Sequence, residues 1–348
     1  MRYYLHFLLS HTIFVPLWVG LFLKGSYTFL LLGYVFIYLV LLDLIFGKEK
    51  YFSLKSEIQY TESKQYKLIL YCWSFIHIFN VLITLYLIHL NLFSIFETIG
   101  IIFSLGAMCS QSVGVSHELC HKNKKLDKIL AKIMLFFVFY NHFEIEHKIG
   151  HHINVATELD PATAKFGQSF YNFLPQTVFG GIKNAYIIDA KKNGYGVYNR
   201  IVKYFFLYIV WMTFLFLWSP LTCLFLFSTS IIAIILLESI NYFEHYGLER
   251  KKLENGTYES VKFHHSWDND SCISNWLLFR IGRHADHHLF PYKEYQYLTP
   301  IDRAGQLPFG YLLMTIISLV PFLFFDIMNP RVIAIKKKYD QLNNYSSI

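Results

Sequence analysis

Charged residues are scarce in this chain, because Asp, Glu, Lys and Arg together make up only 16% of its 348 residues. A soluble domain typically carries about 25% charged residues, so this chain has too few to cover its surface in water. Hydrophobic residues account for 54% of the sequence, and the mean hydropathy is +0.35. The scarcity of charge excludes an ordinary soluble domain and predicts an integral membrane protein.

The cysteine residues do not form a regular pattern. The five cysteines lie without a C-x-x-C pair or a regular spacing, at Cys72, Cys109, Cys120, Cys223 and Cys272. This pattern excludes a disulfide scaffold and a zinc ribbon, and it predicts small apolar packing residues. Internal repeats and low-complexity tracts are also absent from the sequence. The first apolar run lacks a small-residue cleavage site and is soon followed by a second run, so we expect a retained span instead of a signal peptide.

Six apolar runs have about the length that a membrane-spanning helix needs, which is about 20 residues. They lie near residues 7–23, 27–46, 68–90, 92–114, 204–218 and 221–239. Within each consecutive pair the runs are joined by a very short turn. The sequence therefore predicts an all-α integral membrane protein whose six transmembrane helices form three hairpins. Two shorter apolar runs, 128–140 and 311–325, are expected to be buried or interfacial helices.

The connections between the predicted hairpins are long and basic. The first connection alone carries Lys48, Lys50, Lys55, Lys64 and Lys67, whereas the three short turns together hold only Lys24. By the positive-inside rule, we expect the long connections and both termini in the cytoplasm. The net charge of +7 then reflects orientation and attraction to anionic lipid, or a docking surface for an acidic electron donor. We expect residues 1–348 to form one domain, with cytoplasmic catalytic segments at 115–203 and 240–310.

Nine of the 16 histidines form a pattern. They are His117 and His121 in "HELCHK", His147, His151 and His152 in "EHKIGHH", His245 in "NYFEHYG", and His284, His287 and His288 in "RHADHH". Spacings of three to five residues on helices direct imidazoles at one point. All four segments end or follow predicted spans on one side of the membrane, so the nine rings are expected to converge there. The other seven are expected to be packing or interfacial residues, namely His6, His11, His77, His89, His142, His264 and His265.

The first of these segments alone matches the H-E-x-x-H pattern of zinc proteases. One zinc ion takes about four ligands, so nine histidines exceed one zinc site and suit two metal ions with open positions. Imidazole binds iron, copper, nickel and zinc alike. A metal pair beneath an apolar bundle would receive hydrocarbon or acyl chains from the lipid, and oxidising their C–H bonds requires redox chemistry that zinc lacks. These considerations favour a di-iron centre that activates O2.

The four histidine segments resemble the histidine boxes of the membrane-bound alkane 1-monooxygenases and their xylene monooxygenase relatives, within the wider group of membrane di-iron desaturases and hydroxylases. The resemblance runs from about Val115 to Leu298 and includes "VATELDPAT", "HSWDND" and "KEYQYL" beside the boxes. It implies that the nine histidines bind two non-haem iron ions. It also implies that five neighbouring carboxylates orient imidazoles by accepting the second ring proton, namely Glu118, Glu146, Asp160, Glu244 and Asp286.

The resemblance further implies an activity, the conversion of an alkane to a 1-alkanol at a terminal methyl group with O2 as co-substrate. Electrons would come from a rubredoxin or ferredoxin-type donor with its NAD(P)H reductase. The protein would be a multi-pass protein of a bacterial inner membrane, with no nucleic-acid partner. The chain departs from the family in having Cys120 inside the first box, where a small residue is more familiar. Such departures leave the metal site intact and the substrate open.

Three alternatives remain. A di-iron hydroxylase or desaturase of this kind would act instead on an alkyl-aromatic compound or a lipid acyl chain, although the "NYFEHYG" segment favours hydrocarbon hydroxylation. A membrane zinc protease would need only His117, Glu118, His121 and one further ligand, which leaves most of the nine histidines without a task. A metal transporter would place ionisable groups near the midplane of the membrane, whereas these histidines lie at the ends of spans.

Overall fold

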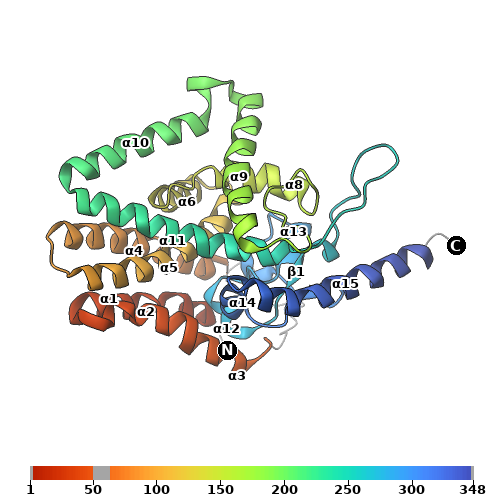
Figure 1. The fold of residues 1–348 in the computed structure, drawn as a ribbon, viewed down its shortest axis with the longest axis horizontal. Helices are drawn as coiled ribbons and strands as arrows, with labels where there is room; N and C mark the ends of the chain where they lie inside the picture. Colours follow the sequence, from red (N-terminus) through yellow and green to blue (C-terminus); the bar gives the residue numbers. More distant parts are fainter. Residues whose placement is uncertain (1–2, 50–62, 346–348) are drawn as a thin grey trace.

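The computed structural model describes residues 3–49 and 63–345, and in this part of the chain six helical segments are long and apolar enough to cross a membrane. They are Tyr3–Leu23, Gly25–Phe46, Lys64–His89, Ile95–Cys120, Arg200–Trp218 and Pro220–His245. The segments lie side by side on one side of the molecule (Figure 1). The prediction of an all-α membrane protein with six spans in three hairpins is confirmed. Of the lysines in the first connection, Lys50 and Lys55 lie outside the described residues.

The first two spans are irregular and the other four are continuous helices. The irregular spans consist of η1 (Tyr3–His11), α1 (Phe14–Leu23), η2 (Gly25–Phe29), α2 (Leu30–Gly33), η3 (Tyr34–Tyr38) and α3 (Leu39–Phe46). The continuous helices are α4 (Ser63–His89), α5 (Ile95–Cys120), α10 (Arg200–Trp218) and α11 (Pro220–His245). A helix of 26 residues is about 39 Å long, which exceeds the hydrocarbon core of about 30 Å. The last turns of α5 and α11 therefore carry their histidines beyond the apolar stretch.

Helices α5 and α11 pack directly against each other at the centre of the bundle. Gly106 makes the close approach possible, since a Cβ added there would lie 2.7 Å from the side chain of Ile232. Small residues allow such approaches between helices in lipid, where packing drives association. Ser104, half a turn before Gly106, donates a hydrogen bond of 2.7 Å to the carbonyl of Thr28 and joins α5 to the second span. This packing places His117 and His245 at the same end of the bundle.

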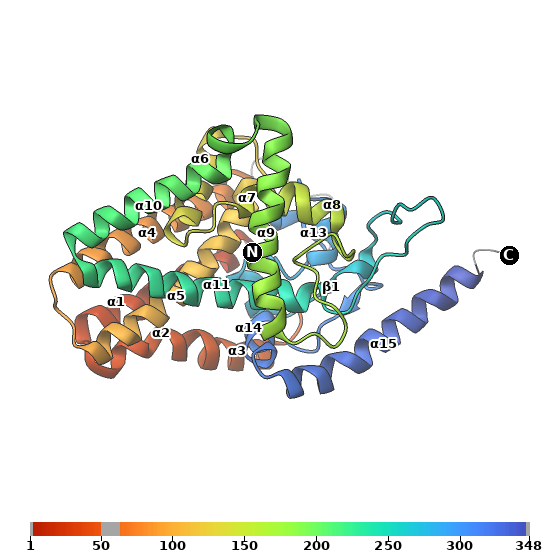
Figure 2. The same cartoon turned by 45° about the horizontal axis from the view of Figure 1, so that its top comes forward.

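The remaining elements gather at that end. They are α6 (Lys125–Phe137), α7 (Phe143–Ile145), η4 (Glu146–His151), α8 (His152–Asn154), α9 (Phe170–Asn193), η5 (Gly196–Tyr198), η6 (Phe263–His265), α12 (Cys272–Leu277), α13 (His284–Leu289), η7 (Tyr295–Tyr297), α14 (Tyr311–Ser318) and α15 (Pro321–Tyr345), with the short parallel strands β1 (Trp267–Asp268) and β2 (Gly305–Gln306). Helix α9 runs across the direction of the spans, and α15 projects away from the body (Figure 2). The apolar runs 128–140 and 311–325 fall on α6 and on α14 with the start of α15, and neither is among the six spans of the described residues.

A buried carboxylate joins the second span to the segment that precedes "RHADHH", which we call the third histidine box. Asp43 accepts hydrogen bonds from the backbone amides of Ile273 at 2.9 Å and Ser274 at 3.2 Å, and from the Ser274 hydroxyl at 2.5 Å. A carboxylate at this position satisfies the free amides of the first turn of α12. Glu49 adds a second link, because it pairs with Arg283 at 2.8 Å directly before His284. The second span thus fixes the position of the third box.

Candidate metal centre

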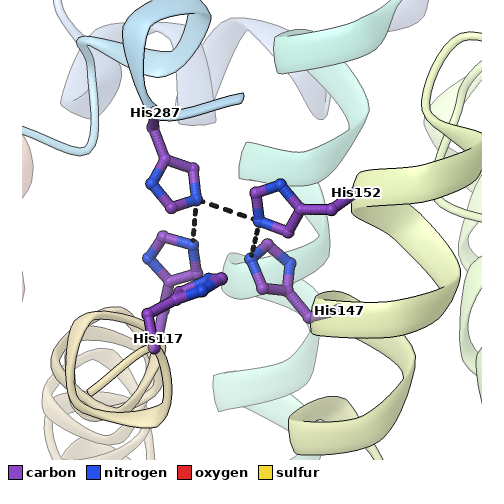
Figure 3. Close-up of side chains that lie close together, drawn as sticks. His117, His147, His152 and His287 are labelled. Atoms are coloured by element: carbon purple, nitrogen blue, oxygen red, sulfur yellow. Dashed lines mark hydrogen bonds between the residues drawn. The ribbon is translucent and has the colours of Figure 1, made fainter. Parts of the chain in front are cut away.

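The structure brings all nine histidines together as two neighbouring groups. The five-histidine group consists of His117, His121, His147, His152 and His287, and the four-histidine group consists of His151, His245, His284 and His288. Within each group, one nitrogen of every ring lies within 4.8 Å of the others. Figure 3 shows four rings of the five-histidine group, those of His117, His147, His152 and His287, which point towards a common centre from different segments. Whether these residues bind metal stays a prediction.

Histidines that are adjacent in sequence belong to different groups. His151 and His152 divide in this way, and so do His287 and His288. Successive residues of a helix point about 100° apart, so the two side chains of such a pair face the centres of two different histidine groups. The rings of His152 and His288 lie 4.6 Å apart between their centroids, which brings the two groups into contact.

A π-helical turn arranges the second box. In η4 the backbone amide of His152 bonds to the carbonyl of His147 five residues earlier, whereas an α-helix would pair residues four apart. The wider turn brings His147 and His152 into the same group, with their Nε2 atoms 3.0 Å apart, and it leaves His151 for the other group. Gly150 permits this turn, since a Cβ there would lie 2.7 Å from Oε1 of Glu146. Single π turns of this kind are rare and occur frequently at functional sites.

Distances between the ring nitrogens fit ligands of metal ions. Nε2 of His287 lies 2.9 Å from that of His117 and 3.1 Å from that of His152. Nε2 of His284 lies 3.0 Å from those of both His245 and His288. Each nitrogen of a neutral imidazole is either a hydrogen-bond donor or a hydrogen-bond acceptor. Hydrogen bonding alone therefore does not explain why Nε2 of His287, or of His284, lies close to the Nε2 atoms of two other histidines at once.

Coordination geometry accounts for the same spacing. Nitrogens about 2.1 Å from one ion lie about 3.0 Å apart when they subtend a right angle and about 3.4 Å apart in a tetrahedron. The observed distances of 2.9–3.1 Å therefore fit ions with five or six positions better than a tetrahedral zinc. Imidazole is a suitable ligand for iron in such a geometry.

Burial keeps most of these imidazoles neutral, as metal ligation requires. Desolvation, reinforced by neighbouring imidazoles, lowers the pKa well below its ordinary value for His147, His152, His284, His287 and His288. Burial also lowers the pKa of His121 to about 3. His151 differs, because the charge of Asp160 and a hydrogen bond to it outweigh the effect of burial and raise the pKa of His151.

Two of the five predicted carboxylates contact imidazoles. Oδ2 of Asp160 lies 2.9 Å from Nδ1 of His151. Oε1 of Glu244 lies 3.3 Å from Nδ1 of His284 and also accepts a hydrogen bond of 2.9 Å from the Tyr311 hydroxyl. A partner at Nδ1 fixes the orientation of the ring and leaves Nε2 for the centre of the group.

The other three predicted carboxylates contact different groups. Glu118 pairs with Lys122 at 2.8 Å, Asp286 pairs with Lys293 at 2.5 Å, and Glu146 lines a polar cavity. An orienting role for all five carboxylates stays a prediction. The thiol of Cys120, which the sequence left open, is buried and donates to the carbonyl of His117 in its own helix at 3.2 Å.

Two groups that hold the histidines in place were missed from the sequence, although both lie in or beside the quoted "HSWDND" segment. Asp268 accepts a hydrogen bond of 2.6 Å from the amide of Ala285 in the first turn of α13, and burial raises the pKa of Asp268 to about 7. His265 was expected to be a packing residue, yet its carbonyl lies 3.2 Å from Nδ1 of His245 and accepts the proton there.

His265 also forms a third, smaller group with Glu259 and His264. Nδ1 of His265 accepts a hydrogen bond of 3.0 Å from the amide of Lys262, so in the neutral ring the proton is on Nε2. That Nε2 lies 3.5 Å from Oε1 of Glu259. The hydrogen bond at Nδ1 anchors this ring to the loop that holds His245, whereas Nε2 has no hydrogen-bond partner among the described residues.

An apolar cavity extends from the interior of the bundle to both histidine groups. Its walls are chiefly aliphatic and come from the first two spans, α5, α11, α12 and α14; they include Val35, Met108, Leu237, Leu277 and Leu312. His117, His147 and His284 line it as well. Along α5 the lining residues run from Ala107 to His117, which corresponds to about 15 Å of helix. A long, thin, apolar ligand would lie in this cavity with one end at the histidines.

Comparisons with known proteins agree with this arrangement. The family described as "Fatty acid desaturase" matches residues 93–318, which include all nine histidines. The chain is 36% identical over 301 residues to an "Alkane 1-monooxygenase" of Acinetobacter baylyi, over 84% of this chain and 73% of that protein. It is 35% identical over 278 residues to "Alkane 1-monooxygenase 1" of Alcanivorax borkumensis, over 78% and 69%. It is 28% identical over 240 residues to the "Xylene/toluene monooxygenase hydroxylase component" of Pseudomonas putida, over 67% and 63%.

Proposed function

Because the chain belongs to the alkane 1-monooxygenase family within the fatty acid desaturase group, we propose that it is a membrane non-haem di-iron monooxygenase that hydroxylates the terminal methyl group of a hydrocarbon. The observation that carries this proposal is the continuity of the apolar cavity with both histidine groups. An alkane dissolved in the bilayer would enter the cavity without passing through water. The product would be a 1-alkanol.

We assign one iron ion to each histidine group, with all nine histidines as ligands. Iron held there would supply the redox chemistry that activates O2, the co-substrate, towards an unactivated C–H bond. The part of the protein in the metal site, besides the ligands, is to hold the imidazole rings in the right orientation. The groups at Nδ1 of His151 and His245 accept the ring protons, so Nε2 of each ring would be free for the metal. Glu244 lies 3.3 Å from Nδ1 of His284 without a hydrogen bond to it.

The cavity would determine which carbon reacts. Apolar burial stabilises a bound chain by about 0.8 kcal/mol for each methylene, so a linear alkane fills the cavity along its length. The cavity ends at His117, His147 and His284, where the terminal methyl group would lie. Positioning the reacting bond in this way supplies catalysis by orientation, and the apolar walls exclude water from it.

We further infer the surroundings of the enzyme. Exposed Lys124 and Lys125 lie at the histidine end of α5, and the positive-inside rule therefore supports a cytoplasmic active site in a bacterial inner membrane. A rubredoxin or ferredoxin-type protein, reduced by its NAD(P)H reductase, would deliver electrons on that face. The residues lining the cavity extend from Ile13 to Thr315, which supports a single oxygenase domain for residues 1–348.

A second candidate substrate is the methyl group of an alkyl-aromatic compound, because one relative is named as a xylene/toluene monooxygenase component. A lipid acyl chain is the third. A panel of linear alkanes, xylene and acyl lipids, supplied with a surrogate electron-transfer chain and analysed by gas chromatography, separates the three. We expect 1-alkanols from the alkanes and about two iron ions for each chain. Reaction with acyl lipids alone, or zinc in place of iron, would contradict the proposed function.

A further inference from the structure

Glu238 is a buried carboxylate inside the last span, and the proposed mechanism does not use it. It lies in α11 seven residues before His245, hence on the same face of the helix and about 10 Å along its axis. Its side chain accepts hydrogen bonds from the Tyr140 hydroxyl at 2.6 Å, the Thr177 hydroxyl at 2.8 Å and the Asn241 amide at 3.1 Å. Ionisable residues inside spans are costly and commonly mark functional sites, proton relays among them.

The surroundings of Glu238 act on its two forms in opposite directions. The residue is 1% exposed, and the three hydrogen bonds described for it come from neutral donors. Burial away from water and from cations disfavours the carboxylate, whereas three donors favour it. A carboxyl group under opposed influences of this kind is suited to accept and release a proton.

A polar cavity connects Glu238 with the histidine groups. The cavity is small, and its lining includes Glu238, Glu146, His147 and His151. Oε1 of Glu146 is buried there with no hydrogen-bond partner among the described residues. The free space in the cavity is about 10 Å³, close to the minimum of about 10–15 Å³ that one water molecule needs, so a single water fits beside this oxygen.

The polar cavity is separate from the apolar one but adjoins it. Only Phe143, His147 and Asn241 line both. The polar cavity therefore places carboxyl groups beside His147, which also lines the apolar cavity proposed for the hydrocarbon.

One layer of residues separates the polar cavity from a solvent cleft. Ala162 and Gly181 line the cavity, while their neighbours Pro161 and Gly180 line the cleft, which has a volume of about 1790 Å³. Asn184 also lines the cleft, and its side chain hydrogen-bonds to Glu146 across this layer. Solvent protons thus have a short polar path to the cavity.

We propose that Glu238 and the polar cavity deliver the protons that the reaction consumes, on a route separate from that of the hydrocarbon. The inference rests on the proposed function, in which R–H and O2, with two electrons and two protons, give R–OH and water. The donor protein supplies the electrons. The carboxyl O–H bond of Glu238 breaks with its electron pair left on the carboxylate, and the proton passes through cavity water to the oxygen that leaves as water. Solvent then reprotonates the carboxylate from the side of the cleft, and Tyr140 and Thr177 are positioning residues.

The first test compares Glu238→Gln with Glu254→Gln, a matched control whose side chain is exposed and lines neither cavity nor the cleft. We expect E238Q to keep its iron and to form alcohol about 100-fold more slowly, which is the effect of losing a general acid. Glu238→Ala vacates the space of the carboxyl group, so formic acid should enter there and restore part of the rate of that variant. The control keeps the rate of the wild type and gains nothing from formic acid. A wild-type rate in E238Q, or loss of its iron, would overturn the proposal.

The second test is independent of any hydrocarbon. In the wild-type protein, infrared spectra should contain a carboxyl band that moves on transfer to D2O and is missing from E238Q. If E238Q does not fold, Tyr140→Phe decides, because it removes only the hydrogen bond to Oε1 and should shift the band and lower the rate about tenfold. Proton delivery by Glu238 would be refuted if Y140F had an unshifted band and an unchanged rate. It would also be refuted if the wild-type protein had no exchangeable carboxyl band. If the wild-type protein shows the exchangeable band but oxidises no alkane, the proposed function is refuted instead.

Discussion

Gly114 offers a direct test of the apolar cavity as the substrate site. It lines the cavity on α5 three residues before His117, and a Cβ added there would meet nothing within 4 Å. Gly114→Phe therefore projects a ring into empty space instead of into protein. Beyond this position the lining continues along α5 as far as Ala107, a further distance of about 10.5 Å. The variant should close that part of the cavity to substrate and leave the histidine end intact.

The expected effect depends on chain length. An extended alkane with carbon–carbon bonds of about 1.5 Å advances about 1.25 Å per carbon, so the closed part holds about eight methylenes. At about 0.8 kcal/mol for each buried methylene, their loss removes up to about 6 kcal/mol of binding. This corresponds to a decrease in kcat/KM of up to about 10⁴-fold for a long alkane. Butane, which needs only the part near His117, should lose far less.

The assay is the rate of 1-alkanol formation from butane, octane and hexadecane, measured by gas chromatography with iron content determined in parallel. Gly114→Ala is the control, since its small side chain leaves the cavity open and should stabilise the helix by about 0.5–1 kcal/mol. If G114F retains its iron and oxidises hexadecane as fast as the wild type does, the apolar cavity is not the site of the hydrocarbon.

Three further predictions concern the histidine groups and the bundle. His245→Ala removes one of four ligands and should lower the iron content from about two ions to about one for each chain; metal analysis that still finds two would contradict the assignment. Asp160→Asn removes the charge at Nδ1 of His151 and should weaken metal binding about 10–100-fold, as competition with a chelator measures. Gly106→Ala places a Cβ 2.7 Å from Ile232 and should destabilise the bundle by about 1–3 kcal/mol. Thermal unfolding in detergent checks this value, and an unchanged Tm would show that α5 and α11 have room to spare.

The six spans were predictable because each is a single apolar run, but their ends were not. The fourth run was predicted to stop at residue 114, whereas α5 continues to Cys120, and the sixth was predicted to stop at residue 239, whereas α11 continues to His245. Hydropathy reports where lipid ends, while a helix continues as long as its backbone hydrogen bonds are formed and its side chains are packed. Here the extra turns are buried by α13, η4 and the loop at His265, which are distant in sequence.

The histidines were predictable as a set but not as two groups. Imidazole spacing identifies residues that share a helix face only if the helix is regular, and η4 is a π turn that pairs His147 with His152 instead of His151. The steric room for that turn comes from Gly150, whose effect on Glu146 is visible only in the folded chain. The sequence therefore identifies the histidines that gather, and their division between two groups requires the backbone.

Glu238 shows why the polar cavity could not be predicted. In the sequence it is one acidic residue near the end of an apolar run, and such a residue ordinarily marks the membrane surface. Its partners Tyr140 and Thr177 lie 98 and 61 residues away; the turn after α6 brings Tyr140 to α11, and the crossing of α9 brings Thr177. Without those hydrogen bonds a carboxylate would avoid the interior of the bundle. Thr177 and Gly181 of α9 line the polar cavity, which adjoins the apolar cavity at Phe143, His147 and Asn241.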